Sequence, residues 1–374
     1  MRIPGWTVSL LGLLLLAGYS DGASDNSLPL SRGWEKTFGG NSKEYGRSVQ
    51  QTSDSGYIIA VSSSGDAYLV KTDAAGNVEW QKTFGEELFN EGYSVQQTTD
   101  GGYIIAGYTG DGTFRDAYLV KTDAAGNEEW QKTFGRNKFD YGHSVQQTTD
   151  GGYIIAGYTG YGTNWDVYLV KTDAAGNEEW QKTFGGEEDD RGYSVQQTTD
   201  GGYIIAGSTR SYGAGRSDVY LIKTDAAGNE EWQKTFGGDK PDFGYSVQQT
   251  TNGGYIIAGG SRGDAYLVKT DAAGNEEWQK TFGEYDSDQG HSVQQTTDGG
   301  YIIAGYTGYG TGRSDVYLVK TDAAGNVEWQ KTFGGEEDDR GYSVQQTTDG
   351  GYIIAGSSAG DVYLIKTDAD GNID

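Results

Sequence analysis

The side chains that could do covalent chemistry are few in this sequence of 374 residues. Two stretches, Gly259–Gly263 and Gly356–Gly360, match the Gly-x-Ser-x-Gly pattern that presents a serine nucleophile. That pattern needs a sharp turn between a strand and a helix, whereas both stretches lie in short loops between predicted strands. Two matches in segments rich in Gly and Ser reflect composition, so we predict no serine nucleophile and no enzyme.

The two histidines, His143 and His291, are the only side chains that ordinarily titrate near neutral pH. Four other repeats carry tyrosine at the same place, at Tyr93, Tyr193, Tyr245 and Tyr342. We therefore interpret the position as a packing site for aromatic rings and not as a metal site. The two histidines also lie three repeats apart, which is too far to share an ion easily.

Two acidic loops are candidate calcium sites. Glu187–Asp190 and Glu336–Asp339 both read Glu-Glu-Asp-Asp, and carboxylate oxygens are ligands that Ca²⁺ prefers. The candidate ligands are Glu187, Asp189, Glu336 and Asp338. The alternative is a solvated turn, which we favour, so no cofactor is predicted. Arg262–Asp264 reads Arg-Gly-Asp, but an Asp opens the same predicted strand in every repeat, so Asp264 is interpreted as structural.

Aromatic and arginine residues in the variable loops are the stronger candidates for function. Aromatic faces beside arginine suit sugars or protein partners. The predicted ligand-binding residues are Phe114, Arg115, Tyr161, Trp165, Tyr212, Arg216, Tyr309 and Arg313. The alternative is that these loops pack only on themselves.

The chain that must position these residues repeats one unit seven times. Trp recurs at 34, 80, 130, 180, 232, 278 and 329, and Ser-Val-Gln-Gln-Thr begins at 48, 94, 144, 194, 246, 292 and 343. A period near 50 residues is typical of propeller blades. One unit divides into four predicted strands, at 144–148, 153–159, 166–172 and 178–184, and Asp-Gly and Asp-Ala-Ala-Gly sequences make the tight turns between them.

The connections fix the order of the strands. A link between blades must cross from an outer strand to the next inner strand, and a tight turn is too short for that distance. We therefore predict 144–148 as innermost and the charged strand 178–184 as the outer edge. The chain begins with an isolated outer strand, Trp34–Phe38, and ends without one. The sequence thus predicts an all-β, seven-bladed β-propeller over residues 32–374, with four antiparallel strands per blade and the N-terminal strand completing the last blade.

Both long connections of each unit emerge on one face of this ring, which we call the loop face. All length variation among the repeats falls on the loop face, and loops on a rigid scaffold are where binding usually occurs. The repeated Trp residues are expected between neighbouring blades, where their large side chains pack the ring together.

The N-terminus and the composition predict export. Arg2 followed by the apolar run Val8–Ala17 indicates a signal peptide over residues 1–20, with a linker over 21–31. A bacterial lipoprotein signal would carry a cysteine where Tyr19 stands, so no lipid anchor is predicted. A net charge of −26 and the absence of Cys exclude a basic nucleic-acid surface and disulfides. We predict a monomeric extracellular, cell-surface or periplasmic protein with no membrane span.

The repeated unit resembles a known family. Asp-Gly-Gly-Tyr-Ile-Ile-Ala-Gly, Asp-Val-Tyr-Leu-Val-Lys-Thr-Asp, Gly-Asn and Trp together resemble the repeats of exported bacterial and archaeal β-propellers, across 32–374. That resemblance implies a surface or lipoprotein-like propeller without a defined activity. The order Asp173, Gly176, Trp180 is also similar to the tryptophan-docking repeat of quinone-dependent dehydrogenases and of propeller lipoproteins that assist outer-membrane assembly. The Asp-to-Trp spacing is one residue shorter here, and no vicinal Cys pair accompanies it.

These observations favour binding over catalysis. Near-identical blades supply the same groups seven times, which suits multivalent contact better than an asymmetric active site. We predict a non-enzymatic binding scaffold that uses its loop face for a glycan or protein partner. The first alternative is a carbohydrate-active lyase or hydrolase at the mouth of the channel. The second alternative is an assembly scaffold in the cell envelope.

Overall fold

The computed structural model describes residues 33–40, 42–63, 65–85, 89–111, 113–135, 138–162, 164–283, 287–308 and 313–373. The predicted signal peptide and linker, including Tyr19, lie outside these residues. The described residues form 28 strands, as predicted for an all-β chain. Among them there is no helix with the length and hydrophobicity that a membrane span requires.

The strands form seven sheets of four antiparallel strands, here called blades 1 to 7 in chain order. The innermost strands are β2 (Glu44–Gln51), β6 (Phe89–Gln97), β10 (Phe139–Gln147), β14 (Asp190–Gln197), β18 (Asp242–Gln249), β22 (Gln289–Gln295) and β26 (Asp339–Gln346). The second strands are β3 (Tyr57–Ser63), β7 (Tyr103–Gly110), β11 (Tyr153–Tyr161), β15 (Tyr203–Thr209), β19 (Tyr255–Ser261), β23 (Tyr301–Gly308) and β27 (Tyr352–Ser358).

The outer half of each blade is equally regular. The third strands are β4 (Asp66–Thr72), β8 (Asp116–Thr122), β12 (Asn164–Thr172), β16 (Asp218–Thr224), β20 (Asp264–Thr270), β24 (Ser314–Thr321) and β28 (Asp361–Thr367). The outer strands are β5 (Val78–Phe84), β9 (Glu128–Phe134), β13 (Glu178–Phe184), β17 (Glu230–Phe236), β21 (Glu276–Phe282), β25 (Val327–Phe333) and, in blade 7, β1 (Trp34–Phe38).

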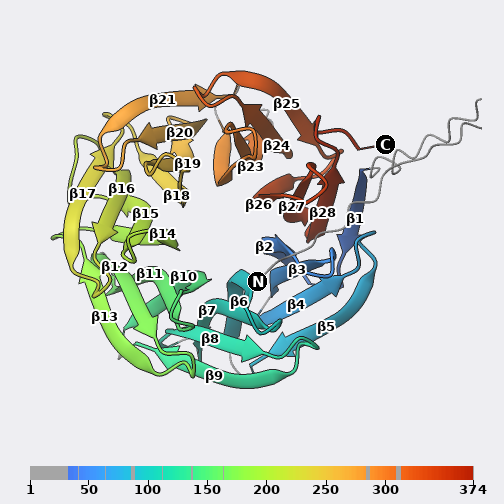
Figure 1. Cartoon of the computed structure of the whole chain (residues 1–374), viewed down its shortest axis with the longest axis horizontal. Helices are drawn as coiled ribbons and strands as arrows, with labels where there is room; N and C mark the ends of the chain where they lie inside the picture. Colours follow the sequence, from blue (N-terminus) through green and yellow to red (C-terminus); the bar gives the residue numbers. More distant parts are fainter. Residues whose placement is uncertain are drawn as a thin grey trace, which may run out of the picture. The chain divides into compact units, whose positions relative to one another are not determined.

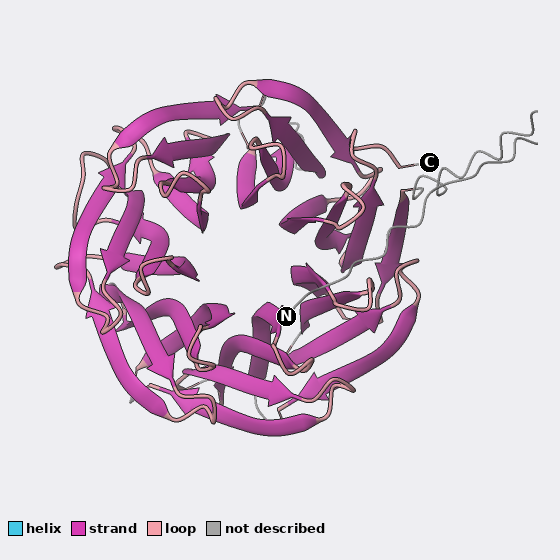
Figure 2. Ribbon diagram, viewed as in Figure 1, coloured by secondary structure: helices cyan, strands magenta, loops and turns pink. Residues whose placement is uncertain are grey.

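The predicted strand order and the predicted closure of the ring are both confirmed. Figure 1 shows the seven sheets around a ring, with the innermost strands at its centre and the outer strands at its rim. β1 pairs antiparallel with β28, from Trp34 opposite Lys366 to Phe38 opposite Val362. Figure 2 shows that strands account for nearly all of the ring, with loops only at its two faces. The sheet of blade 7 therefore joins the first described strand of the chain to the last.

The repeated Ser-Val-Gln-Gln segment connects the blades around the central channel. The backbone N–H of Val95 donates to Ser48 Oγ at 3.3 Å, and that of Gln97 donates to Gln50 Oε1 at 2.6 Å. The Ser and Gln contacts recur at every junction of the ring, including the junction between blades 7 and 1. Val and Gln side chains from all seven inner strands line a channel cavity of about 250 Å³. The constancy of this segment is thus structural.

The repeated Trp residues lie between neighbouring blades, as predicted. Trp130 of blade 2 contacts Tyr153 of blade 3 edge-on, with ring centroids 5.8 Å apart. The Trp130 ring also lies over Gly176 in the tight turn of blade 3, where a Cβ would stand 2.6 Å from the ring. Gly176 has a φ of 75°, so this turn requires glycine both for its backbone and for the close approach of the indole.

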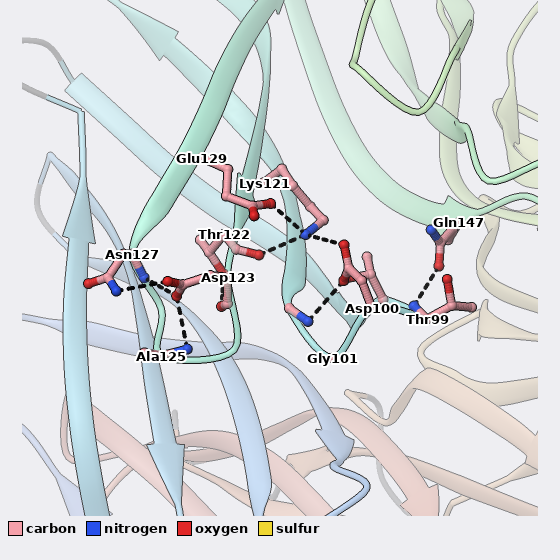
Figure 3. Close-up of polar contacts among 12 residues, drawn as sticks. Thr99, Asp100, Gly101, Lys121, Thr122, Asp123, Ala125, Asn127, Glu129 and Gln147 are labelled. Carbon is pink, nitrogen blue, oxygen red and sulfur yellow. Dashed lines mark hydrogen bonds and ion pairs between the residues drawn. The ribbon is translucent and has the colours of Figure 1, made fainter.

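A buried lysine on the third strand pairs with two acidic residues in blades 1 to 4 and 6, one from the turn before the second strand and one from the outer strand. In blade 2 the Lys121 side chain is 3 % exposed, and its Nζ lies 2.9 Å from both Asp100 Oδ2 and Glu129 Oε2. The ammonium also donates to the carbonyl of Thr122 at 2.8 Å. Figure 3 shows these three contacts converging on one nitrogen. Hydrogen bonds from Thr98, Lys121 and Gly102 lower the pKa of Asp100 to about 2, although partial burial opposes the shift.

Candidate functional site

Seven side chains, one from each inner strand, form a closed ring at the loop-face end of the channel. In blade 3 the strand register passes from Gly142 to Ser144, which leaves His143 as the extra residue of a β-bulge. The same bulge occurs in each of the other six inner strands. A bulge re-aims the side chain of its extra residue. The seven residues are Arg47, Tyr93, His143, Tyr193, Tyr245, His291 and Tyr342, and we call them the bulge ring.

Each member of the bulge ring contacts the member from the next blade. The aromatic centroids are 4.4 Å apart for Tyr93 and His143, and 4.8 Å apart for Tyr245 and His291. The three remaining aromatic contacts in the ring are at 5.5 to 5.6 Å. Arg47 completes the ring, because its guanidinium lies 4.9 Å from the Tyr342 ring and 5.7 Å from the Tyr93 ring. The predicted aromatic packing role of the histidine position is confirmed.

The two histidines are held neutral. Both residues are half-buried overall, but the Nε2 atom of each is enclosed and has no hydrogen-bond partner among the described residues. Burial, followed by the positive charges of Arg47 and Arg191, lowers the pKa of His143 to about 3. Burial, with Arg47 and Arg340, lowers that of His291 to about 4. The enclosed Nε2 atoms therefore cannot reach a substrate, and the lowered pKa makes each imidazole a weak base.

Replacing both histidines with the tyrosine of the equivalent blades, His143→Tyr and His291→Tyr, is expected to flatten the pH dependence of stability. A folded-state pKa below the unfolded value of 6.5 means that stability is complete above pH 6.5 and is lost as pH falls toward 4 and then 3. The wild type should therefore lose about 1 kcal/mol per histidine at pH 5.5 relative to the double variant. Urea unfolding at pH 7.5 and 5.5 measures the difference, and equal losses in the two proteins would refute it.

A second tier of residues surrounds the bulge ring and differs from blade to blade. These residues stand two positions before the bulge in each inner strand. They are Tyr45, Glu91, Tyr141, Arg191, Phe243, Gln289 and Arg340. The second strands add Tyr108, Tyr158 and Tyr306 at places where the other blades carry Ser or Gly. Differences among otherwise near-identical blades thus concentrate at the channel mouth and in the loops above it.

The largest group of these residues covers blades 2 to 4. Tyr141 packs against Tyr158 with ring centroids 4.7 Å apart, and against Trp165 at 5.9 Å. Tyr108 meets Tyr141 edge-on at 5.1 Å. Two guanidinium groups lie on these rings: Arg115 is 4.6 Å from the Tyr108 ring, and Arg191 is 5.1 Å from the Tyr158 ring. We call these six residues, Tyr108, Arg115, Tyr141, Tyr158, Trp165 and Arg191, the aromatic–arginine cluster.

Polar contacts hold the cluster in place. Arg115 Nη1 donates to the hydroxyl of Tyr141 at 2.7 Å. Glu91 accepts from the hydroxyls of both Tyr93 and Tyr108, at 2.8 and 2.9 Å, and so joins the cluster to the bulge ring. Burial and the nearby Glu91 carboxylate raise the pKa of the Tyr108 hydroxyl, which stays protonated and able to donate. Tyr108 and Tyr141 are buried, so they support a preorganised surface that Arg115, Tyr158, Trp165 and Arg191 present.

The structure brings only some of the predicted ligand-binding residues together. Arg115 and Trp165 belong to the cluster, while Phe114 and Tyr161 lie beside it, each contacting Phe139. Tyr161 is 68 % exposed and Phe114 is 42 % exposed, so both present aromatic surface to solvent. Tyr212 lies apart, against Tyr220 at 5.7 Å. Arg216 and Arg313 are exposed, and Tyr309 lies outside the described residues.

The candidate calcium ligands do not converge. Asp189 is ion-paired with Arg210 at 3.4 Å and lies 3.8 Å from Arg191. Asp338 is paired with Arg340 at 3.1 Å, and Glu187 and Glu336 are exposed. Within the described residues no group of three or more His, Cys, Asp or Glu side chains is arranged to hold a metal. The geometry thus gives the calcium hypothesis no support, and both acidic loops hold arginines instead.

The two Gly-x-Ser-x-Gly stretches and Arg262–Asp264 are parts of hairpins. Ser261 ends β19 and pairs with Asp264, the first residue of β20. Gly356–Gly360 runs from β27 through the equivalent hairpin into β28. Neither stretch leads into a helix, so neither has the geometry of a nucleophile elbow. The predicted position of both stretches between strands, and of Asp264 at the start of a strand, is confirmed.

Comparison with solved structures supports the fold. A catalytically inactive virginiamycin B lyase from Staphylococcus aureus, with quinupristin, is 6% identical over 90% of this chain and 99% of that chain, with a TM-score of 0.59. YCF48 bound to D1 peptide is 10% identical over 91% and 96%, with a TM-score of 0.54. Sqt1 from Chaetomium thermophilum, bound to the N-terminus of the ribosomal protein L10, is 10% identical over 88% and 97%, with a TM-score of 0.53. No family model and no curated protein matches the sequence.

Proposed function

We propose that this chain is a non-enzymatic recognition propeller that binds a protein segment through the aromatic–arginine cluster. The observation that carries the proposal is where the blades differ. Side chains of the channel interior and of the blade junctions are repeated almost without change. Side chains of the mouth differ among the blades, and the combination found over blades 2 to 4, with Arg115 and Trp165, occurs once in the described residues. Trp, Tyr and Arg are also the residues that dominate binding energy at protein interfaces.

Two of the structural relatives, YCF48 and Sqt1, are complexes with a peptide and with a protein N-terminus. Their likeness to this chain extends to the fold and lends the proposal general support. The exposed rings of Tyr161 and Phe114 would enlarge the contact at one edge of the cluster. We also propose that recognition occurs outside the cytoplasm, from the apolar run Val8–Ala17 and the absence of Cys.

A lyase or hydrolase at the channel mouth is less well supported. Such an enzyme needs a base that reaches its substrate, and the two histidines at the mouth are held neutral with their Nε2 atoms enclosed. An envelope assembly scaffold is a special case of protein recognition, in which the bound segment belongs to another envelope protein.

The proposal can be tested by selecting peptides that bind the full ring from a random displayed library. We expect selected peptides to bind Trp165→Ala and Arg115→Ala variants at least tenfold more weakly than wild type, because these side chains would contribute buried rings and fixed charge. Arg216→Ala is the matched control, since Arg216 is an exposed arginine of the same face that lies outside the cluster. Selected peptides that bind all four proteins equally would refute the proposal, as would selection of glycans but no peptides on parallel arrays.

A further inference from the structure

A second kind of pocket recurs at the rim of the loop face, where the outer strands of a blade meet the segment arriving from the preceding blade. Blades 2, 3 and 5 each have such a pocket, of about 570, 290 and 360 Å³. The linings correspond: each contains a Tyr of the third strand, a Gln-Lys-Thr of the outer strand, and the Gly that follows the previous outer strand. We call these the rim pockets.

The rim pocket of blade 5 is lined almost entirely by polar groups. Its aromatic surface is Tyr266, whose hydroxyl donates to Gln279. Gly237 and Gly238 form one side, Lys280 with Thr281 another, and Ser261 with the carboxylate of Asp264 a third, which can accept hydrogen bonds from sugar hydroxyls. This lining offers several hydrogen-bonding groups around one aromatic ring, with no aliphatic side chain among the lining residues.

An arginine overhangs the blade 5 pocket. Arg262 has a φ of 58° and Gly263 a φ of 92°, so the two residues form a tight two-residue hairpin between β19 and β20. The Arg262 guanidinium lies beside Gly238, another residue of the lining, because a Cβ on that glycine would be 3.4 Å from Nη2. Within the described residues no carboxylate is ion-paired with Arg262, although the chain carries 54 acidic residues.

In blade 4 the chain fills the equivalent pocket with its own side chain. Tyr212 packs on Tyr220, the counterpart of Tyr266, with ring centroids 5.7 Å apart. Its hydroxyl donates to the carbonyl of Gly185, the counterpart of Gly237, at 2.8 Å. Tyr220 is accordingly 1 % exposed, against 5 % for Tyr266. A flat ring that carries a hydroxyl thus fits this place in the blade.

We propose that the rim pocket of blade 5 binds a hexuronate unit of an acidic polysaccharide. The sugar ring lies against Tyr266 as the Tyr212 ring lies against Tyr220, and a hydroxyl donates to Gly237. The carboxylate pairs with the guanidinium of Arg262 through two parallel hydrogen bonds. The remaining hydroxyls contact Gln279 and Thr281. The site is separate from the aromatic–arginine cluster and does not depend on the function proposed for it.

The lining favours a sugar over an aromatic side chain of a partner protein. A phenol gains most from apolar walls on both faces, whereas this pocket has one ring and otherwise hydrogen-bonding groups. Sugar hydroxyls replace the water that these groups would lose on binding, and the carboxylate neutralises the arginine. In blade 4 the single hydroxyl of Tyr212 donates to Gly185, and the Tyr212 ring shows the shape of the group that this place in the blade accepts.

The proposal can be tested by titrating the full ring with methyl glucuronoside or methyl galacturonoside. NMR spectra of the labelled protein report the binding. We expect saturable binding at one site, weakened at least tenfold in Arg262→Ala and less in Arg262→Lys, because lysine keeps the charge but loses the planar fork. Gly238→Phe should abolish binding by filling the pocket. Methyl glucoside should bind at least tenfold more weakly than the uronates.

Arg313→Ala removes an exposed arginine of blade 6 and controls for a general loss of positive charge, so it should bind the uronates like wild type. Tyr212→Ala is expected to leave uronate binding by the blade 5 pocket unchanged. Equal binding by wild type and Arg262→Ala, or no saturable binding of either uronate, would overturn the proposal. Binding of N-acetyltyrosine amide in preference to the uronates at the same residues would overturn it in favour of a protein partner. Thermal unfolding of each variant shows that the ring remains folded.

Discussion

A chain that lacks β1 should lose about 5 kcal/mol of stability or more, because deletion of Trp34–Phe38 opens the ring. β28 would lose all five paired residues of its outer neighbour. Trp34 contacts Tyr57 of blade 1 at 5.9 Å, and Lys36 donates to Asn77 of the same blade at 3.1 Å. The deletion therefore removes a sheet edge and a blade junction together.

Urea unfolding of a chain that begins at residue 39 measures this effect. The matched control begins at residue 33 and keeps β1. A synthetic peptide of residues 33–40 added to the shorter chain should restore part of the lost stability, because the exposed edge of β28 accepts a strand. A shorter chain with the same unfolding midpoint as the control would contradict the closure described above.

Removal of both acids around a buried lysine is the second change with a large expected effect. In blade 2 the double variant Asp100→Asn with Glu129→Gln leaves the Lys121 ammonium without a counter-charge, with the carbonyl of Thr122 and neutral amide oxygens as its acceptors. Breaking a fully buried pair costs 3–5 kcal/mol, and the exposure of the two carboxylates places the expected loss here at the low end, about 3 kcal/mol. Lys121→Met should cost less, because both carboxylates are half-exposed and can be hydrated.

The test is whether the double variant loses more unfolding free energy than Lys121→Met. Chemical unfolding of both variants at pH 7 measures this difference. Blade 5 supplies a natural control, because Asn252 stands there in place of the aspartate and Lys269 is paired with Glu277 at 2.9 Å. Asn252→Asp should therefore stabilise the ring slightly. A greater loss in Lys121→Met than in the double variant would show that the carboxylates, and not the ammonium, carry the cost of burial.

The two predictions concern groups that are repeated in the ring, whereas the proposed function concerns groups that are not. Repeated residues such as Ser48, Gln50 and Lys121 are used between or within blades. Arg115, Trp165 and Arg191 have no equivalent in most blades, and the structure brings them together at one place. This separation of roles lets the mouth vary without disturbing the junctions.

The sequence was sufficient for the fold because each step depended on local rules. Turn residues such as Gly176 marked the ends of strands, and the charge of 178–184 marked the outer edge. The unpaired strand at Trp34–Phe38 predicted the closure of the ring. The placement of Trp between blades also followed, since a large side chain on an outer strand has a neighbouring blade as its nearest apolar surface.

The candidate site was only partly predictable. Arg115 and Trp165 were identified as loop residues, although Trp165 lies in β12, where the strand begins two residues earlier than predicted. The other four members of the cluster lie within strands and were missed: Tyr108, Tyr141, Tyr158 and Arg191. Their signal was nevertheless present, because position 141 carries five different residue types among the seven repeats, whereas the following glycine is constant. Comparison of the repeats position by position, rather than loop by loop, would have found the second tier.

The sequence by itself determined the number of blades, the order of their strands, the closure by β1 and the face that carries variation. Only the tertiary structure decided that Arg47 completes a ring with six aromatic side chains. It also decided that Tyr212 fills the rim pocket of blade 4, whereas Arg262 lines the corresponding pocket of blade 5. The physical reason is the kind of contact involved. Strands and turns follow from neighbours along the chain, whereas these contacts depend on a β-bulge that re-aims a side chain and on distances between blades about 50 residues apart.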